Sequence, residues 1–367
     1  MFSHIDPINY DNQLLKKQED MTNLFSEFNF PGFDVYTSDP INYRQRAEFR
    51  LWHEGDDLYY IMFDQATKKK FKVEYFPVAC TLINELMSAL LENIRDKQLL
   101  RERLFQVDFL ATLSGEAVIS LLYHKQLSEE WQQQAIWLKQ QLECICPVNI
   151  IGRAKKQKLI IDSDFVTETL NVSGQELTYQ QVENSFTQPN GKVNEKMLTW
   201  AQNATKDKGG DLVELYCGNG NFSIALAKNF NRVIGTEISK TSVKSAQVNI
   251  ALNNIENIDI VRMSSEEFSQ AMNGERKFRR LEGFDLTNYN YDSVLVDPPR
   301  AGLDPDSVAL VSRFNHVIYI SCNPETLKEN LVELVKTHTI EKMALFDQFP
   351  YTHHIETGVI LTRRETF

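Results

Sequence analysis

The second half of the chain alternates short apolar runs with segments of helical pattern. The runs "DLVELYC" (211–217) and "HVIYISC" (316–322) are apolar at most positions, and the second is followed by "NPETLKENLVELVKTH", which has the period and the early proline of a helix. Strands that are apolar on both sides have to be covered on both sides, as in a parallel sheet flanked by helices. The pattern therefore predicts an α/β fold built on a doubly wound parallel sheet.

The C-terminal end departs from this alternation. The runs "EKMALFDQF" (341–349) and "ETGVILTRR" (356–364) are separated only by "PYTHHI". A link this short cannot hold a crossover helix, so the two strands are expected to pair antiparallel. A Rossmann-like parallel sheet that ends in an antiparallel hairpin is typical of methyltransferases that use S-adenosylmethionine (SAM), whereas dinucleotide dehydrogenases usually stay parallel.

The first half has the pattern of a separate α+β domain. Two stretches, "YRQRAEFRLWHEGDDLYYIMFD" (43–64) and "QVDFLATLSGEAVISLLYHK" (106–125), have the composition of β-hairpins with turns at "EGDD" and "SGEA". Helical patterns lie between and after them. We predict two domains, residues 1–178 and residues 179–367, with the parallel sheet in the second.

Composition limits the class of protein. The chain has 367 residues, 42% of them hydrophobic, and five scattered cysteines, which are too few for a disulfide framework. It has no apolar segment of signal-peptide or membrane-span length, so a cytoplasmic protein is expected. The net charge of −11 opposes a protein coated with nucleic acid, but basic residues cluster at 43–50, 68–72, 153–158 and 276–280. A local RNA-binding face therefore remains open.

A glycine-containing loop, "ELYCGNGNFS" (214–223), follows one strand and opens a helix. Gly218 and Gly220 let backbone N–H groups approach a ligand, but Ser223 stands where the pyrophosphate fingerprint has a third glycine. A ligand without a diphosphate therefore fits better. Glu237 ends the next strand, where its carboxylate can accept hydrogen bonds from both ribose hydroxyls of an adenosine. The simpler alternative is that Glu237 is only a negative charge near the N-terminus of the following helix.

Two further strand ends carry chemistry. Asp297 ends the strand in "VLVDPPRAGL", and Cys322 ends the next one, on the same predicted sheet edge. A thiolate that adds to C6 of uracil makes C5 nucleophilic enough to take a methyl group, and a base must then remove the proton from C5. Glu356, at the start of the last strand, is the candidate base. The helix that begins after Asn323 is expected to favour the thiolate.

A metal site is not expected. His353 and His354 are adjacent, and adjacent residues of a strand point to opposite faces, so no shared ligand geometry is predicted. Cys144 and Cys146 alone do not make a zinc site.

Five motifs in order resemble the RNA uracil-5-methyltransferase family: "ENSFTQPN" (183–190), "LYCGNGNFS", "VDPPRAGL", "ISCNPETL" and "HHIETGVIL". The resemblance implies a SAM-dependent methyltransferase with Cys322 as nucleophile and Glu356 as proton-abstracting base. It implies SAM contacts from the residues that match the motifs, which are Gln188, Tyr216, Gly218, Asn221, Glu237 and Asp297. Ribosomal-RNA members usually carry a cysteine cluster for an iron–sulfur centre, which this sequence lacks, so no such cluster is expected.

The first half is similar to the bacterial tRNA (uracil-5-) branch of that family. This similarity implies the T-arm of tRNA as substrate, with 5-methyluridine in the T-loop (m5U54) as product, other RNAs with a T-loop-like fold as further partners, and a monomer with no membrane partner. A stacked base must be extracted before its C6 is reachable. The candidate RNA contacts are Arg44, Arg46 and Arg50 on one strand face and Phe105 and His124 at hairpin ends.

Three alternatives stay open at this point. A cytosine-5-methyltransferase uses the same thiol addition, although it typically places its cysteine in another motif. An RNA-binding protein that holds SAM without turnover would tolerate loss of Cys322. A dinucleotide dehydrogenase would bind NADH.

Overall fold

The computed structural model describes residues 2, 4–64, 67–282 and 290–365. The chain divides into two compact units, and each is interrupted in the sequence. Unit 1 contains Asp39–Thr169 and Gln180–Gly191 together with a short N-terminal stretch that ends at Pro7. Unit 2 contains Ile8–Ser38, Leu170–Tyr179 and the chain from Lys192 onward.

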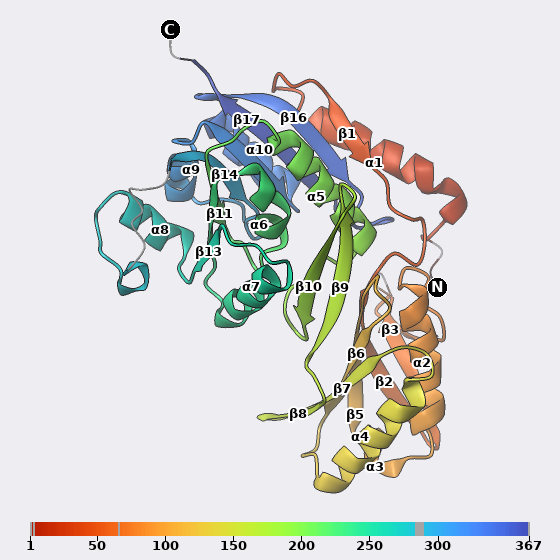
Figure 1. Ribbon diagram of the computed structural model, residues 1–367. Coiled ribbons are helices and arrows are strands. Elements are labelled where there is room, and N and C mark those ends of the chain that lie inside the picture. The colour runs from red at the N-terminus through yellow and green to blue at the C-terminus, as the bar shows by residue number, and fades with distance from the viewer. Residues whose placement is uncertain (1, 3, 65–66, 283–289, 366–367) are drawn as a thin grey trace. The chain divides into compact units, whose positions relative to one another are not determined.

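Unit 1 is an α+β unit, as the sequence predicts (Figure 1). Its described residues form a sheet in the order β4-β3-β2-β5-β6-β7-β8, antiparallel except where β6 and β7 run parallel. The strands are β2 (Arg46–Glu54), β3 (Asp57–Phe63), β4 (Lys70–Val73), β5 (Leu104–Ala111), β6 (Ala117–Tyr123), β7 (Val148–Ala154) and β8 (Gln157–Ile161). The helices are α2 (Thr81–Ile94), α3 (Gln98–Arg101) and α4 (Glu129–Leu142). The two predicted hairpins are β2–β3 and β5–β6.

One face of the unit 1 sheet is buried under α2 and α4. In β2, buried residues alternate with exposed ones, so that Ala47, Phe49 and Leu51 enter the core while Arg46 and Arg50 lie on the other face. The opposite face is therefore the one on which charged side chains are presented. A further two-stranded sheet, β9 (Phe165–Val172) with β10 (Gln175–Val182), has residues in both units.

Unit 2 contains the predicted parallel sheet and its antiparallel hairpin. In the described residues the strand order is β1-β16-β17-β15-β14-β11-β12-β13. The strands are β1 (Phe33–Tyr36), β11 (Asp211–Leu215), β12 (Arg232–Thr236), β13 (Ile258–Val261), β14 (Tyr291–Val296), β15 (His316–Ser321), β16 (His338–Phe346) and β17 (Glu356–Arg363). As predicted, β17 is antiparallel to β16, and it also pairs antiparallel with β15.

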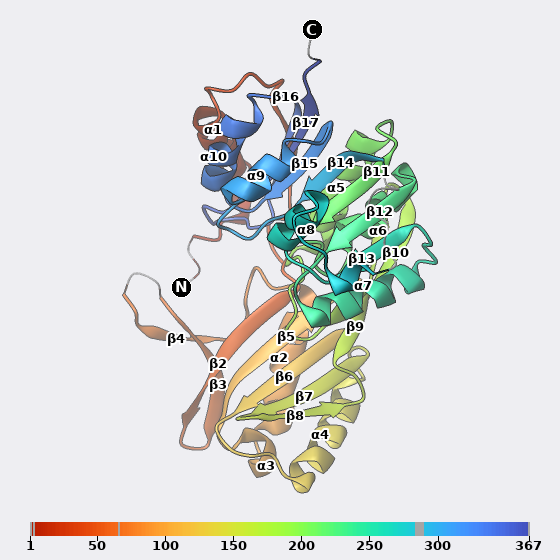
Figure 2. The same cartoon turned by 90° about the vertical axis from the view of Figure 1, so that its left-hand side faces the viewer.

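Helices cover both faces of this sheet (Figure 2). The α-helices are α1 (Tyr10–Leu24), α5 (Gly191–Thr205), α6 (Asn221–Leu226), α7 (Lys240–Leu252), α8 (Ser265–Met272), α9 (Pro305–Val311) and α10 (Pro324–Leu334), and the 3-10 turns are η1 (Pro7–Asn9), η2 (Ala227–Asn229) and η3 (Arg279–Leu281). Successive strand residues enter opposite cores: Val317 packs with α9 and α10, and Ile318 packs with α5 and α6. This double burial explains why the strands are apolar at nearly every position.

The N-terminal segment differs from the sequence prediction. Residues 8–38 belong to unit 2, where α1 packs against its core and β1 adds to the sheet edge beside β16. The prediction of one boundary, between residues 178 and 179, placed this segment in the first domain. A four-residue edge strand has no sequence pattern that indicates which strand it pairs with. The assignment of RNA binding to 1–178 and of catalysis to 179–367 remains a functional prediction.

The described residues contain no helix that combines the length and the apolar character needed to cross a bilayer.

Packing at the start of β17 can be tested at Gly358. A Cβ atom at this position would come within 2.6 Å of the Trp200 ring and 3.2 Å of the Phe346 ring. We expect Gly358→Ala to reduce the free energy of unfolding by about 1–3 kcal/mol, because neither buried ring has space to move. Urea denaturation measures the change. Thr339→Ala, at an exposed position of β16, is the control, and its free energy of unfolding should stay within about 0.5 kcal/mol of that of the unaltered protein. Equal free energies of unfolding for the two variants would contradict the close packing around Gly358.

Candidate active site

The carboxyl ends of β11, β12 and β14 lie in register. The last residue of β11 pairs with the last residues of both neighbouring strands. Tyr216, Glu237 and Asp297 each follow directly after one of these strands, so they form a row along one sheet edge. This is the edge at which open parallel sheets bind ligands, and it is where the sequence predicts these side chains.

The loop after β11 is held in an unusual backbone conformation. Tyr216 has a φ of +64°, and Gly218 and Gly220 have φ values of +55° and +84°. A bulky residue with positive φ costs about 1–3 kcal/mol and persists only where the surroundings hold it. The Tyr216 hydroxyl lies 2.8 Å from the Ser265 hydroxyl at the start of α8. The loop is therefore fixed from a neighbouring helix.

Asparagines from three helices satisfy the polar groups of this loop. The side chains of Asn221 and Asn194 exchange two hydrogen bonds of 2.9 and 3.1 Å. Asn249 donates to the Asn219 carbonyl at 3.0 Å, and the Tyr179 hydroxyl donates to the Asn221 carbonyl at 3.1 Å. These contacts leave the loop with a defined shape before any ligand binds.

Glu237 accepts two backbone hydrogen bonds. Its carboxylate oxygens receive the N–H of Gly218 at 3.0 Å and the N–H of Ser239 at 2.6 Å. Ser239 in turn caps α7 by accepting from the Ser242 N–H. The carboxylate is half-buried and keeps lone pairs for further donors. Its geometry is compatible with the predicted ribose contact, which remains a prediction.

Cys322 stands between β15 and α10. The next residue, Asn323, caps α10 by accepting from the Glu325 N–H at 3.3 Å, and it donates to the Arg300 carbonyl at 3.0 Å. Thr326 also donates to that carbonyl, at 3.3 Å. The loop that carries Cys322 is therefore tied to the loop that follows Asp297.

Glu356 lies opposite Cys322 in the antiparallel register. The last pair between the antiparallel strands β15 and β17 is Ser321 with Thr357. Cys322, which follows Ser321, and Glu356, which precedes Thr357, therefore lie at the same edge of the sheet. The Glu356 side chain is buried, and Cys322 is half-buried. The predicted nucleophile and base are thus brought together.

Burial and mutual repulsion perturb the carboxyl groups. Burial, and then the charge of Asp297, raise the pKa of Glu356 well above its ordinary value. Burial raises the pKa of Asp297 to about 7. Two adjacent carboxyl groups with raised pKa values retain a proton more readily than exposed ones, which suits a group that must accept and release protons.

The thiol does not behave as the sequence suggests. Burial, followed by the charges of Glu356 and Asp297, raises the pKa of Cys322 to about 11, although Arg300 lowers it slightly. The expected stabilisation of a thiolate by α10 is outweighed, because Cys322 precedes the helix cap and Pro324 offers no N–H.

Glu214 is a buried acid next to the candidate site that the sequence pattern did not reveal. It lies inside β11, is 1% exposed, and accepts a hydrogen bond from the Ser223 hydroxyl. Burial raises its pKa to about 8, with Asp297 and Glu237 adding to the shift. An acid within the apolar run "DLVELYC" is the signal that could have revealed it, since a buried carboxyl needs a partner. Ser223, which replaces the third glycine of the pyrophosphate fingerprint, is that partner.

Gln188 lies in the irregular segment after β10 and is grouped with unit 1. Its side chain is half-buried. Its predicted contact with SAM stays a prediction.

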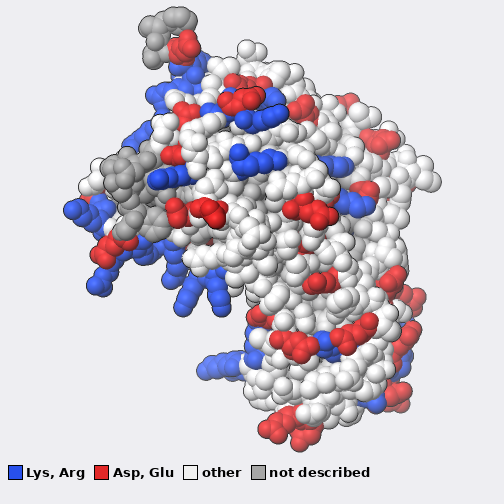
Figure 3. Space-filling view, viewed as in Figure 1, with Lys and Arg blue, Asp and Glu red and all other residues white. Residues whose placement is uncertain are grey.

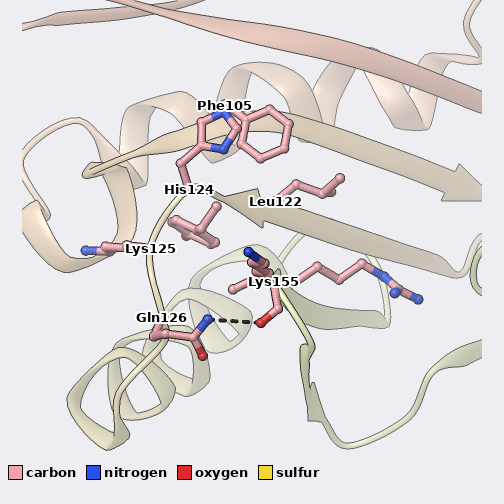
Figure 4. Close-up of a pocket in the computed structure, with 9 residues that line it drawn as sticks. Phe105, Leu122, His124, Lys125, Gln126 and Lys155 are labelled. Atoms are coloured by element: carbon pink, nitrogen blue, oxygen red, sulfur yellow. Dashed lines mark hydrogen bonds between the residues drawn. The ribbon is translucent and has the colours of Figure 1, made fainter.

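In unit 1 the structure brings Phe105 and His124 together. Their rings stack with centroids 3.9 Å apart and planes 10° from parallel. Phe105 lies at an irregularity in the pairing of β5 with β6, and His124 follows the end of β6, so both sit at the open end of the hairpin. The stacked pair borders a depression of about 580 Å³ that Lys125, Gln126 and Lys155 also line (Figure 4).

The three arginines occupy different environments. Arg46 and Arg50 share the exposed face of β2, whereas Arg44 precedes the strand. Arg46 donates to the Ser185 carbonyl at 2.6 Å, and Arg50 lies 5.8 Å from the centre of the Phe63 ring. Burial lowers the pKa of Arg44, and its guanidinium donates to the Arg46 carbonyl. Burial alternates from Tyr43 to Leu51, so Arg44 keeps the phase of Arg46 and Arg50, and RNA contact by the three stays a prediction.

The adjacent histidines differ from the expectation as well. His353 and His354 lie in a loop before β17, and their ring centroids are 4.0 Å apart, so they do not point to opposite faces of a strand. Within the described residues no group of three or more His, Cys, Asp or Glu side chains is placed to hold a metal ion.

Comparison with known proteins resolves the family. Residues 9–364 match the family model described as tRNA (Uracil-5-)-methyltransferase. The chain belongs to the tRNA (uracil-5-)-methyltransferase family. A tRNA/tmRNA (uracil-C(5))-methyltransferase of Colwellia psychrerythraea is 73% identical over 99% of this chain and 100% of its own length. A protein of the same description from Vibrio parahaemolyticus is 58% identical over 98% of both chains.

A solved structure supports the fold. The crystal structure of Pyrococcus abyssi tRNA (uracil-54, C5)-methyltransferase in complex with S-adenosyl-L-homocysteine superposes with a TM-score of 0.72 at 21% identity, covering 96% of this chain and 84% of the other. The predicted fold class, a Rossmann-like methyltransferase domain preceded by an α+β domain, is thereby confirmed. Membership of the tRNA (uracil-5-)-methyltransferase family makes the chain a SAM-dependent methyltransferase, which disfavours the dehydrogenase alternative.

The buried carboxyl of Glu214 predicts a pH dependence of stability. Its pKa is about 8 in the folded protein, against an ordinary value of 4.5. The folded state therefore keeps a proton that the unfolded chain releases, and this contribution is complete below pH 4.5 and is lost as the pH rises to about 8. Between pH 5 and 8.5 we expect the free energy of unfolding of the unaltered protein to fall by about 2–4 kcal/mol more than that of Glu214→Gln.

Urea denaturation across this pH range measures the difference. Glu256→Gln removes an exposed carboxylate of the same unit and should follow the unaltered protein. Parallel curves for Glu214→Gln and the unaltered protein would show that Glu214 ionises normally.

Proposed function

We propose that the protein transfers the methyl group of SAM to C5 of a uridine in the T-loop of tRNA, giving 5-methyluridine at position 54. The relatives are named for tRNA and tmRNA, and the archaeal structure is named for uracil 54. Other RNAs with a T-loop-like fold are included among the substrates. The observation that carries the proposal is the pairing of β15 with β17, which sets a thiol opposite a buried carboxyl group.

Cys322 is the nucleophile in this proposal. The thiol first loses its proton to water. The thiolate sulfur then forms a bond to C6 of uracil, and the electron pair of the C5–C6 double bond moves toward the C4 carbonyl as an enolate. C5 then bonds to the methyl carbon as the bond from that carbon to the sulfonium sulfur breaks, which leaves S-adenosylhomocysteine. The positive sulfonium lowers the raised pKa of the thiol, so attack is favoured when the methyl donor is present.

Glu356 completes the reaction as the base. The ionised carboxylate of Glu356 takes the proton from C5, the C5–C6 double bond re-forms, and the bond from C6 to the Cys322 sulfur breaks. A buried carboxyl next to Asp297 has the proton affinity that this step requires. The charge of Asp297 then disfavours the ionised form of Glu356 and so favours proton uptake.

The row along the sheet edge suits the methyl donor. We assign SAM contacts to Tyr216, Gly218, Asn221, Glu237 and Asp297, with Gln188 as the contribution of the segment after β10. A ligand with a positive sulfonium and a positive amino group would favour the ionised forms of the acidic side chains near this edge, against the burial that raises the pKa of Glu214 and Asp297. They oppose a diphosphate, in agreement with the serine at position 223.

The exposed face of β2–β4 supports RNA binding by unit 1. Three basic side chains lie over aromatic rings there: Arg50 over Phe63 at 5.8 Å, Lys70 over Trp52 at 3.2 Å and Lys72 over Tyr59 at 5.4 Å. Paired cations and exposed rings are what backbone phosphates and unstacked bases require. We include Arg44, Arg46, Phe105 and His124 in the proposed RNA contacts, the last two as a stacking platform.

The acidic net charge is compatible with this substrate. Basic side chains are not spread evenly: in Figure 3, Lys and Arg gather over one side of unit 2, around α7 and α8, while acidic side chains are scattered over the rest of the visible face. Arg262 donates to the Ile238 carbonyl, and Arg280 donates to the Arg262 carbonyl, so these basic residues are contiguous. A cytoplasmic monomer remains the expectation for the enzyme.

The covalent step is tested with a T-arm RNA that carries 5-fluorouridine at the target position. Fluorine cannot leave C5 as a cation, so the enzyme should stall after methyl transfer and form an adduct that survives denaturing electrophoresis. We expect the adduct with unaltered protein and with Cys144→Ala, which removes an exposed thiol, and none with Cys322→Ala. An adduct that persists in Cys322→Ala would move the nucleophile elsewhere. No adduct with any protein would favour an RNA-binding protein without turnover.

The base is tested with ordinary uridine. Glu356→Gln leaves the attack by Cys322 possible but removes the proton acceptor. Covalent RNA should therefore accumulate, and the rate at which methylated product is released should fall by about 100-fold or more. Denaturing gels and product release from radiolabelled SAM give the two rates. Turnover by Glu356→Gln at the rate of the unaltered enzyme would exclude this residue as the base.

A further inference from the structure

Lys17 occupies an unusual position for a lysine. It lies on α1, its side chain is 10% exposed, and its amino group donates three hydrogen bonds. The acceptors are Asp347 at 2.7 Å, the Phe349 carbonyl at 2.9 Å and the His354 carbonyl at 2.9 Å. An ammonium group has three donors, so all of them are used.

The three acceptors belong to one segment, residues 347–355, which connects β16 to β17. The last ladder pair before this segment joins Phe346 to Glu356. Lys17 holds the segment near both ends, because Asp347 is its first residue and His354 is its last but one. The backbone enters β17 at Glu356, two residues after the His354 carbonyl that Lys17 fixes.

Two other residues of the same helix face reinforce this contact. Asp347 is fully buried and also accepts from the Tyr10 hydroxyl at 2.9 Å and from the Gln13 amide at 2.8 Å. Gln13 accepts in turn from the Tyr351 N–H at 3.2 Å. Residues 10, 13 and 17 recur at helical spacing, so a single face of α1 grips the segment.

We propose that Lys17 is a positioning residue for Glu356: the Lys17–Asp347 ion pair fixes segment 347–355 and thereby the place of the base at the sheet edge. The inference rests on the proposed role of Glu356. A proton transfer depends steeply on the position of the acceptor, whereas the addition of Cys322 uses a group on a different loop. Loss of the ion pair should therefore slow the removal of the C5 proton more than it slows formation of the covalent bond.

The test variant replaces both partners, Lys17→Met together with Asp347→Asn, because removing the lysine alone would leave a buried carboxylate without its cation. Two rates are measured on T-arm RNA. Formation of the 5-fluorouridine adduct reports the steps before proton removal, and release of tritium from 5-³H-uridine reports proton removal. We expect adduct formation within about threefold of the unaltered enzyme and tritium release about 10- to 100-fold slower, with covalent RNA accumulating on ordinary uridine.

Two further variants keep the test decisive. Lys16→Met removes the neighbouring lysine, which is exposed and pairs with Asp20, and should leave both rates unchanged. Gln13→Leu keeps the ion pair but removes the hydrogen bonds of Gln13 with Tyr351 and Asp347. It should slow tritium release by a smaller factor than the double variant does, and it replaces the double variant if the latter does not fold. Equal slowing of both rates, or no change in either, would overturn the positioning role. Absence of adduct with the unaltered protein would instead refute the proposed function.

Discussion

Three carboxyl groups that are largely removed from water lie at or just inside the sheet edge that carries the Cys322 thiol. Glu214, Asp297 and Glu356 each have a raised pKa because burial disfavours their charged forms, and Cys322 shares that environment. A site of this kind disfavours the ionised forms of its own acids and thiol. In the proposed mechanism, the positive methyl donor lowers the raised pKa of Cys322 and so favours its attack on the uracil ring.

The arrangement depends on segments that are distant in sequence. The row of strand ends holds Tyr216, Glu237 and Asp297, and the adjoining antiparallel hairpin supplies Glu356. The hairpin connection is in turn held by α1 from the beginning of the chain. Packing thus links the N-terminal helix to the last strand of the sheet, and the position of the proposed base depends on residues more than 300 positions away from it.

Much of this architecture was predictable from the sequence, because strands that are buried on both faces are apolar at most positions. The runs around Val317 and Val294 are apolar at most positions, and Asp297 and Cys322 directly follow them. The antiparallel hairpin followed from the length of its connection. The position of Cys322 opposite Glu356 follows from the register of β15 and β17.

Other features depend on contacts that no local pattern encodes. Segment 8–38 joins unit 2 through β1 and the buried Lys17, whose partner is far along the chain. Glu214 looks like an irregularity in an apolar strand until Ser223 is seen beside it. The raised pKa of Cys322 comes from burial and from acids on other strands, and these outweigh the local helix that the sequence does reveal.

The pH dependence of Cys322 alkylation tests the electrostatic account most directly. Iodoacetamide labelling of the ligand-free protein, followed by peptide mass spectrometry with the exposed Cys144 as an internal reference, reports the ionisation of each thiol. The account predicts that the Cys322 rate still rises about tenfold per pH unit up to pH 10, and that Asp297→Asn shifts this rise to lower pH. A Cys322 rate that levels off below pH 9 in the unaltered protein would contradict it.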